Sequence, residues 1–142
     1  MNRTLAIIKP DAVEAGHLGA IIQQLEEASF RVRAVSMRHL TREQAESFYA
    51  VHSERPFYGS LVEFMTSGPC APMVLDGEDA VSRLRTVIGA TDPNEAEEGT
   101  VRERFAESKE RNAIHASDSP ENARREIGFF YSEAELLGLK AG

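Results

Sequence analysis

His115 is the side chain whose type and setting best suit covalent chemistry. It follows the small apolar pair Ala113 and Ile114, as a residue at the end of a short strand would, and a helix-start signal comes directly after it. Ser119 can cap that helix, and Pro120 has the fixed φ and missing N–H that suit a first helical position. A neutral imidazole is a good nucleophile near pH 7, and a strand-to-turn junction would hold it in one orientation at the rim of a sheet. A lone histidine is more often an ordinary surface or hydrogen-bonded residue, so the interpretation depends on its companions.

Several cationic side chains could supply an anion-binding site beside it. Neither a G-x-x-x-x-G-K-[ST] nor a G-x-G-x-x-G stretch occurs, so a phosphate site would need arginines, a lysine and a helix N-terminus instead of a glycine-rich loop. Lys9 and Thr91 lie at a strand end and in a loop, where sites are built. The arginines that cluster in an otherwise acidic stretch are Arg83, Arg85, Arg102, Arg104 and Arg111. On spacing alone they are equally well read as solvated partners of nearby glutamates.

Size and composition indicate one soluble domain over residues 1–142. The net charge of -7 argues against a dedicated nucleic-acid surface, which needs a basic face. No apolar run approaches a membrane span, and the apolar segment near the first residue leaves no room for a signal peptide. Cys70 is the only cysteine, as in a reducing compartment, and no histidine or cysteine pair has the spacing of a metal site. We therefore expect a cytoplasmic protein with no metal held by its own side chains.

Hydrophobic periodicity predicts four strands and at least five helices. A segment from Ala90 to Asn112 shows only a possible turn near residues 100–105, and loops of that length are usually functional or disordered. Pro72 inside the third strand argues for an edge strand or a bulge. The order of elements favours an α+β fold, a ferredoxin-like sandwich in which helices cover one face of a four-stranded, mainly antiparallel sheet. The expected strands are residues 4–9, 30–40, 70–75 and the residues leading to His115, and the expected helices are 18–28, 41–49, 59–66, 77–88 and 120–130, with a last turn opening at Ser132.

Several motifs in register give the chain a family resemblance over essentially its whole length. They are Ile8-Lys9-Pro10-Asp11, Arg55-Pro56-Phe57, Thr66-Ser67-Gly68-Pro69, Gly99-Thr100-Val101-Arg102 and Arg111-Asn112-Ala113-Ile114-His115-Ala116-Ser117-Asp118-Ser119. In this order and at this spacing the chain resembles nucleoside diphosphate kinases, and its length resembles the short bacterial forms. Ala116 departs from the family by standing where many members have glycine, and Pro72 and Glu98 also differ from common family residues.

The resemblance implies a ping-pong transfer in which His115 takes the γ-phosphate of a nucleoside triphosphate, mainly ATP, and passes it to a nucleoside diphosphate. Glu126 matches the glutamate that accepts a hydrogen bond from one ring nitrogen and leaves the other free to attack. Ser117 matches the serine that supports this glutamate. Tyr49 matches the tyrosine beside the catalytic histidine, although on pattern alone it is as well explained as a core residue of its helix.

The nucleotide ligands also follow from the resemblance. Arg85, Arg102 and Thr91 match the phosphate ligands, while Lys9 and Asn112 match the residues that hold the ribose hydroxyl region. Mg²⁺ is expected to be bound mainly through the nucleotide phosphates.

The base-binding side chain and the assembly complete what the family implies. Phe57 matches the aromatic on which the base stacks, which tolerates every base because every base has a π-face. Family members are homo-oligomers built from dimers, and the sequence does not choose between tetramer and hexamer. Two rival hypotheses are a catalytically silent nucleotide- or nucleic-acid-binding module on the same fold, and a ferredoxin-like regulatory domain that binds a small molecule.

Overall fold

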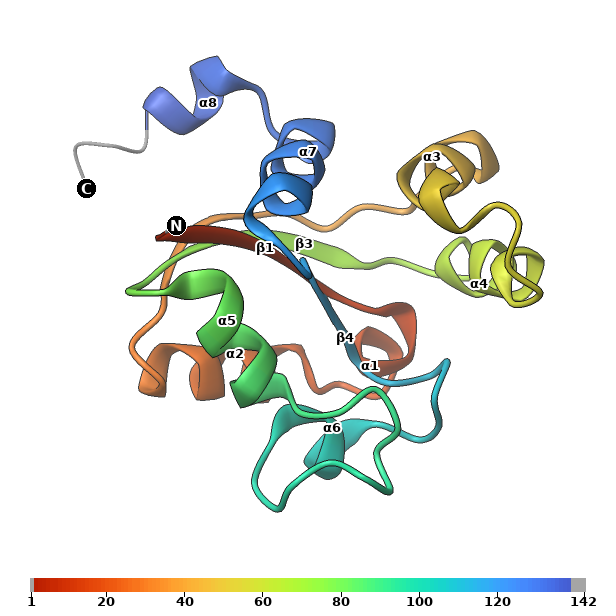
Figure 1. Ribbon diagram of the computed structural model, residues 1–142, viewed down its shortest axis with the longest axis horizontal. Coiled ribbons are helices and arrows are strands. Elements are labelled where there is room, and N and C mark those ends of the chain that lie inside the picture. The colour runs from red at the N-terminus through yellow and green to blue at the C-terminus, as the bar shows by residue number, and fades with distance from the viewer. Residues whose placement is uncertain (1, 139–142) are drawn as a thin grey trace.

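A four-stranded antiparallel sheet forms the centre of the computed structural model, which describes residues 2–138. The strand order is β2-β3-β1-β4, so the ferredoxin-like α+β fold predicted from the sequence is confirmed (Figure 1). The expected domain of residues 1–142 includes residues 1 and 139–142, which lie outside the described part. The strands are β1 (Arg3–Ile8), β2 (Arg31–Val35), β3 (Ala71–Asp76) and β4 (Ile114–Ala116).

Helices cover both faces of this sheet, so the expectation that they cover only one face is wrong (Figure 1). Ala6 and Ile8 of β1 pack in one core, whereas Leu5 and Ile7 pack in the other. A strand with a continuous apolar run is one buried on both faces, because successive side chains point to opposite sides. The helices of the first face are α2 (Leu18–Glu27), α5 (Ala80–Ile88) and α6 (Val101–Phe105), and those of the second are α3 (Arg42–Phe48), α4 (Tyr58–Met65) and α7 (Pro120–Phe130).

Capping signals in the sequence correctly predicted the starts of three helices, two of them α3 and α7. Thr41 forms the predicted capping box with Gln44, and the Ser119 side chain accepts the backbone N–H of Asn122 at 3.1 Å to begin α7. Three short elements complete the chain: α1 (Pro10–Glu14), the 3₁₀ turn η1 (Ala50–His52) and α8 (Glu133–Leu137). Helix α1 was missed because Pro10, read only as the end of a strand, is also the first residue of a helix.

The sequence predicted an edge strand or a bulge at Pro72, and the edge position is wrong because β3 is an interior strand. The register shift between β2 and β3 lies between Val32 and Ala34 and not at Pro72. Pro72 pairs with Ile7 of β1, and its carbonyl accepts a backbone N–H from Ser36, just beyond the end of β2.

Because the N–H and C=O of one residue point to the same side of a strand, the missing N–H of Pro72 also faces Ser36, and one ladder bond is absent there. β2 ends at Val35, and paired backbone hydrogen bonds resume between Arg38 and Cys70. β2 is also shorter than the predicted residues 30–40.

None of the helices within residues 2–138 has both the length and the apolar character needed to cross a membrane.

Candidate active site

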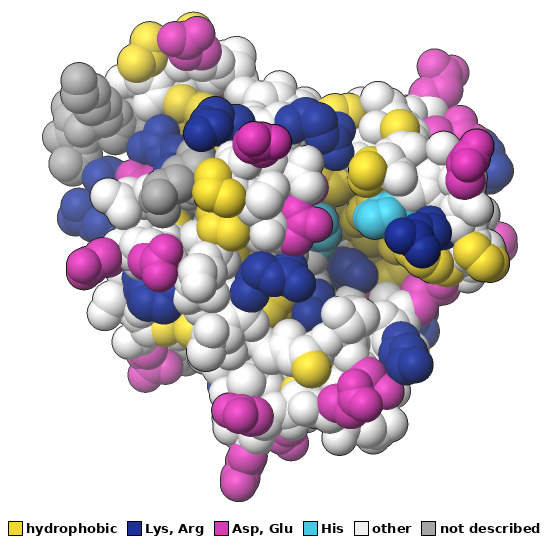
Figure 2. Space-filling model, viewed as in Figure 1, with side chains coloured by type: hydrophobic (Ala, Val, Ile, Leu, Met, Phe, Trp, Pro, Cys, Tyr) yellow, Lys and Arg dark blue, Asp and Glu magenta, His cyan; other side chains and the backbone are white. Residues whose placement is uncertain are grey.

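A cavity of about 600 Å³ opens at the end of β1 where Lys9 follows the strand. We call it the His115 cavity. It collects side chains from elements far apart in sequence, and every site residue predicted from the sequence lines it except Ser117. On the face shown in Figure 2, histidine side chains lie in a hollow bordered by lysine, arginine and hydrophobic side chains. The predicted residues that line the cavity are Lys9, Tyr49, Phe57, Arg85, Thr91, Arg102, Asn112, His115 and Glu126.

The His115 ring is held from behind by a carboxylate. His115 is the central residue of β4, paired with Ile7, and its Nε2 lies 2.8 Å from Oε1 of Glu126 on α7. The Ser117 hydroxyl donates to the same oxygen at 2.7 Å. Burial alone would raise the pKa of Glu126, but the hydrogen bonds from His115 and Ser117 outweigh it, and the pKa lies below its usual range. An ionised carboxylate can only accept, so Glu126 accepts a hydrogen bond from Nε2–H of His115, and in the neutral imidazole the Nδ1 lone pair is then free.

Two aromatic rings fix the plane of this imidazole. Phe48 meets the His115 ring edge-on with centroids 5.5 Å apart, and Tyr49 does so at 6.2 Å. The Tyr49 hydroxyl is buried and has no hydrogen-bond partner within residues 2–138, and burial raises its pKa. The sequence allowed two interpretations of Tyr49, a core residue or a neighbour of His115. Tyr49 packs in the core of the second sheet face and also lines the cavity.

Lys9 and Asn112 form one side of the cavity floor. The Lys9 ammonium donates to Oδ1 of Asn112 at 2.8 Å, and Nδ2 of Asn112 donates to the Thr91 carbonyl at 3.2 Å. Burial, followed by the charge of Arg102, lowers the pKa of Lys9 to about 8. An amide partner holds the lysine in place without neutralising it.

The two arginines are held mainly by backbone carbonyls. Arg102 donates to the carbonyls of Gly89 at 3.0 Å and Ile114 at 2.8 Å, and burial together with the charge of Arg85 lowers its pKa to about 10. Arg85 is exposed and makes only a long contact of 3.5 Å with the Ala116 carbonyl. Within residues 2–138 no carboxylate forms an ion pair with Lys9, Arg85 or Arg102. The cavity thus contains positive charge that an anionic ligand can neutralise.

Phe57 supplies an apolar surface at the same cavity and is 47% exposed. Its ring lies 5.5 Å from that of His52, which also lines the cavity. Sequence reasoning missed several lining residues, and the one with a usable signal is Leu61, one helical turn after Phe57. The others missed as cavity residues are Val51, His52, Lys109, Glu110, Ala116, Asp118 and Asn122.

Ala116 accommodates its Cβ because it lies in the extended backbone of β4. The family's glycine is therefore not required at this point by backbone conformation.

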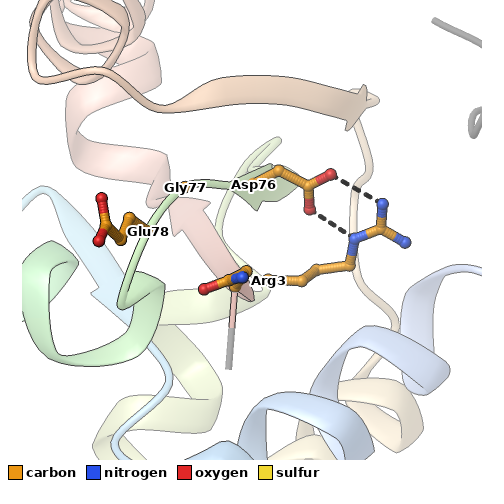
Figure 3. Close-up of a pocket in the computed structure, with 5 residues that line it drawn as sticks. Arg3, Asp76, Gly77 and Glu78 are labelled. Carbon is orange, nitrogen blue, oxygen red and sulfur yellow. Dashed lines mark hydrogen bonds and ion pairs between the residues drawn. The ribbon is translucent and has the colours of Figure 1, made fainter.

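A smaller hollow of about 390 Å³ lies at the other end of β1, and we call it the strand-end hollow. Its main contact is a two-point pair in which Arg3 Nη2 donates to Asp76 Oδ2 at 2.8 Å and Nε to Oδ1 (Figure 3). Arg33 donates to the same carboxylate at 3.1 Å. The cations here are already paired, unlike those of the His115 cavity.

Fold and cavity together are those of a group-transfer enzyme with anionic substrates: a carboxylate-supported imidazole faces unpaired cations in one pocket. The sequence model of the family described as "Nucleoside diphosphate kinase" matches residues 2–136. The chain belongs to this family, and it is a phosphotransferase with nucleoside diphosphate kinase function.

Individual relatives agree with this assignment. The chain is 58% identical to a nucleoside diphosphate kinase of Chlorobium limicola, over 96% of this chain and 98% of that one. It is 59% identical to that of Prosthecochloris aestuarii, over 96% and 97%. A solved structure of the Aquifex aeolicus enzyme superposes with a TM-score of 0.92 at 50% identity, covering 94% of this chain and 97% of that one.

Proposed function

We propose that the kinase works by a ping-pong reaction in which His115 carries the phosphoryl group. Nδ1 attacks the γ-phosphorus of a nucleoside triphosphate, mainly ATP; the N–P bond forms while the bond from phosphorus to the bridging oxygen breaks, and the diphosphate leaves. The reverse steps pass the group to a second diphosphate. The observation that carries the proposal is the 2.8 Å contact of His115 Nε2 with Glu126, because in a neutral imidazole it places the single ring proton on Nε2 and leaves the Nδ1 lone pair free on a ring that lines the cavity.

Glu126 and Ser117 have supporting roles in this reaction. Glu126 stabilises the positive charge that develops on the ring as Nδ1 forms its bond, because its lowered pKa keeps it ionised. Ser117 donates to the same oxygen and fixes the direction in which Glu126 faces the ring. Tyr49, packed edge-on against the imidazole, limits its rotation.

The cavity residues divide the nucleotide among them. Arg85, Arg102 and Thr91 bind the phosphates, where guanidinium groups can follow the charge on the equatorial oxygens of a loose transition state. Lys9 and Asn112 are already joined by a hydrogen bond and bind the ribose hydroxyl region. Phe57 stacks on the base, so all common bases are accepted.

Mg²⁺ fits this site as an ion brought by the nucleotide. Asp118 lines the cavity, and the hydrogen bond from Asn122, then the charge of Arg85, holds its pKa below the usual range. A single ionised carboxylate suits Mg²⁺, which keeps several waters and is usually bound by substrate phosphates plus one or two carboxylates. When bound, the ion neutralises charge on the outer phosphates.

The setting of the enzyme is also a proposal. We infer a cytoplasmic homo-oligomer, a tetramer or hexamer assembled from dimers, which exchanges phosphates between free nucleotides. The net charge of -7 and the single buried Cys70 support a reducing compartment and the lack of a dedicated nucleic-acid surface.

Phosphoenzyme formation tests the proposed nucleophile. Incubation with γ-labelled ATP and Mg²⁺, without an acceptor, should label the protein through an acid-labile, base-stable bond, and His115→Gln should abolish the label. His52→Gln is the matched control, because His52 lines the same cavity and its loss should leave labelling intact. Label that persists in His115→Gln would assign the nucleophile elsewhere. A folded wild-type protein that takes no label would favour the rival reading, a silent binding module on the same fold.

A further inference from the structure

Asp11 is a buried carboxylate for which the reaction above has no use. It is the second residue of α1, is only 5% exposed, and does not line the His115 cavity. Its Oδ2 accepts the backbone N–H of Ala113 at 3.1 Å, across 102 positions of sequence. Its Oδ1 is buried with no hydrogen-bond partner in the described part of the chain. A buried carboxylate with one of its oxygens unpaired is costly, so its presence calls for a reason.

The residue that Asp11 contacts has an unusual backbone. Ala113 has φ +74°, and the N–H of Ile114 donates to the Asn112 carbonyl at 2.9 Å. An i→i+2 hydrogen bond around a positive central φ is the rarer and more strained form of γ-turn. The Cβ of Ala113 makes this conformation unfavourable, since only glycine adopts positive φ freely.

The strained turn is held on both sides by two residues that follow β1, Lys9 and Asp11. Asp11 accepts the N–H of Ala113, while the backbone N–H of Lys9 donates to the Ala113 carbonyl at 2.9 Å. The Lys9 ammonium also holds the Asn112 side chain at 2.8 Å. Strain of this kind persists only where the surroundings over-determine it, and it gathers at functional sites.

The position of the turn links it to the reaction. Asn112, just before it, lines the cavity, and His115 follows two residues after it in β4. A relaxed turn would shift both the amide and the strand that presents the imidazole. Burial is the main influence that raises the pKa of the Asp11 carboxyl, whereas nearby backbone N–H groups and the charges of Lys9 and Arg111 oppose it.

We propose that Asp11 is a positioning residue for phosphoryl transfer: its hydrogen bond to the Ala113 N–H holds the strained γ-turn that sets Asn112 and His115 in register. This inference rests on the proposed role of His115. Asp11 touches no substrate and acts only through the turn. A merely structural role, as an acidic residue in the first turn of a helix, would change stability without changing the rate of the folded enzyme.

The test measures phosphoenzyme formation by rapid quench on protein whose folded fraction is determined by circular dichroism. Asp11→Ala should lower the rate per folded molecule by about tenfold to a hundredfold, because small misplacements of reacting groups have effects of that size. Asp11→Asn keeps an oxygen acceptor and should stay within roughly threefold of wild type, the size of a weakened single hydrogen bond. Glu14→Ala, an exposed carboxylate lost from the same helix, is the matched control and should leave the rate unchanged.

A double-mutant cycle with Ala113→Gly tests the link to the turn. Glycine adopts the positive φ without strain, so the effect of Asp11→Ala should be smaller in the Ala113→Gly background than in wild type. Equal effects in both backgrounds, or a rate loss that only follows the folded fraction, would overturn the proposal. Wild-type protein that carries no label on His115 would instead refute the proposed function, so the two failures are distinguishable.

Discussion

The two ends of β1 carry the same kinds of charged side chain in opposite electrostatic states. At the strand-end hollow, Arg3 and Arg33 share the carboxylate of Asp76 (Figure 3). At the His115 cavity, Lys9 and Arg102 are held by an amide and by backbone carbonyls. In one place the charges neutralise each other, and in the other they remain available to a ligand.

The pKa shifts express this difference. Hydrogen bonding with Asp76 raises the pKa of Arg3, and the same bond lowers the pKa of Asp76, so the charged forms are favoured. Burial, followed by the charge of a neighbouring arginine, lowers the pKa of Lys9 to about 8 and that of Arg102 to about 10, so their charged forms are disfavoured. A site that binds phosphates therefore lowers the stability of the free protein, and a bound polyanion should reverse that loss.

Removing a cation from the His115 cavity should lower the rate of phosphoryl transfer far more than removing one from the strand-end hollow. Arg85→Gln should lower kcat by about 10²- to 10³-fold, as for the loss of one preorganised donor to a transition state, and weaken nucleotide binding much less. Arg85 suits this test because it is exposed and makes few contacts of its own. Single-turnover rates and Kd values separate the two effects, with Arg33→Gln at the strand-end hollow as the control. Equal losses in rate and binding would show that Arg85 binds substrate and transition state alike.

Ligand binding should sharpen the same contrast in stability. ATP with Mg²⁺ at about 100 times Kd should raise the free energy of unfolding by roughly 2.7 kcal/mol, measured by chemical denaturation. The increase should be nearly lost in Arg102→Ala, which removes a buried cation, and retained in Arg3→Ala. An ATP response that Arg3→Ala weakens as much as Arg102→Ala would show that the two hollows are not distinct.

Phe57 should account for a smaller and more uniform share of binding. Phe57→Ala should weaken the binding of purine and pyrimidine nucleotides alike by about 1 to 3 kcal/mol, the value of one stacked base. Titration calorimetry with ATP, GTP, CTP and UTP measures this, and Leu137→Ala, another exposed apolar side chain, is the control. A loss confined to purines would contradict a stacking surface that ignores base identity.

Local signals in the sequence predicted where helices and strands lie. The position of each strand within the sheet depends on long-range pairing, which local signals do not reveal. The Ser119 cap and Pro120 predicted α7 with its observed bounds, because capping depends on a few neighbouring residues. The interior position of Pro72 was not predicted, because the one ladder bond that it removes is compensated by neighbouring pairs, such as Arg38 with Cys70, that only the folded chain brings together. The uninterrupted apolar run of β1 did contain the signal that both faces of the sheet are covered.

For the candidate site, the sequence predicted which residues gather there, but not how their side chains are arranged. The family resemblance predicted site roles for Arg85, Arg102 and Glu126, and all three line the cavity, but which ring nitrogen of His115 meets Glu126 depends on how α7 packs against the sheet. The γ-turn at Ala113 was not predictable, because no glycine or asparagine at that position announces a positive φ.

The dependence of stability on pH gives the smallest expected effect and the most direct comparison of the two ends. Asp76 has a lowered pKa, so its contribution is present above its unfolded value of 3.8 and is lost as pH falls through its folded pKa. Lys9 behaves oppositely: between about 8 and its unfolded value of 10.5 the unfolded chain binds more protons, so stability should rise with pH.

Asp76→Asn should lower the free energy of unfolding at pH 7 by about 0.5 to 1 kcal/mol, as for a partly exposed ion pair, and leave the transfer rate unchanged. Lys9→Met should flatten the rise in the free energy of unfolding between about pH 8 and 10.5, and leave the acid side of the stability curve unchanged. Urea titrations across pH measure both variants, and a Lys9→Met protein that still gains stability between those pH values would show that another group carries the unfavourable charge.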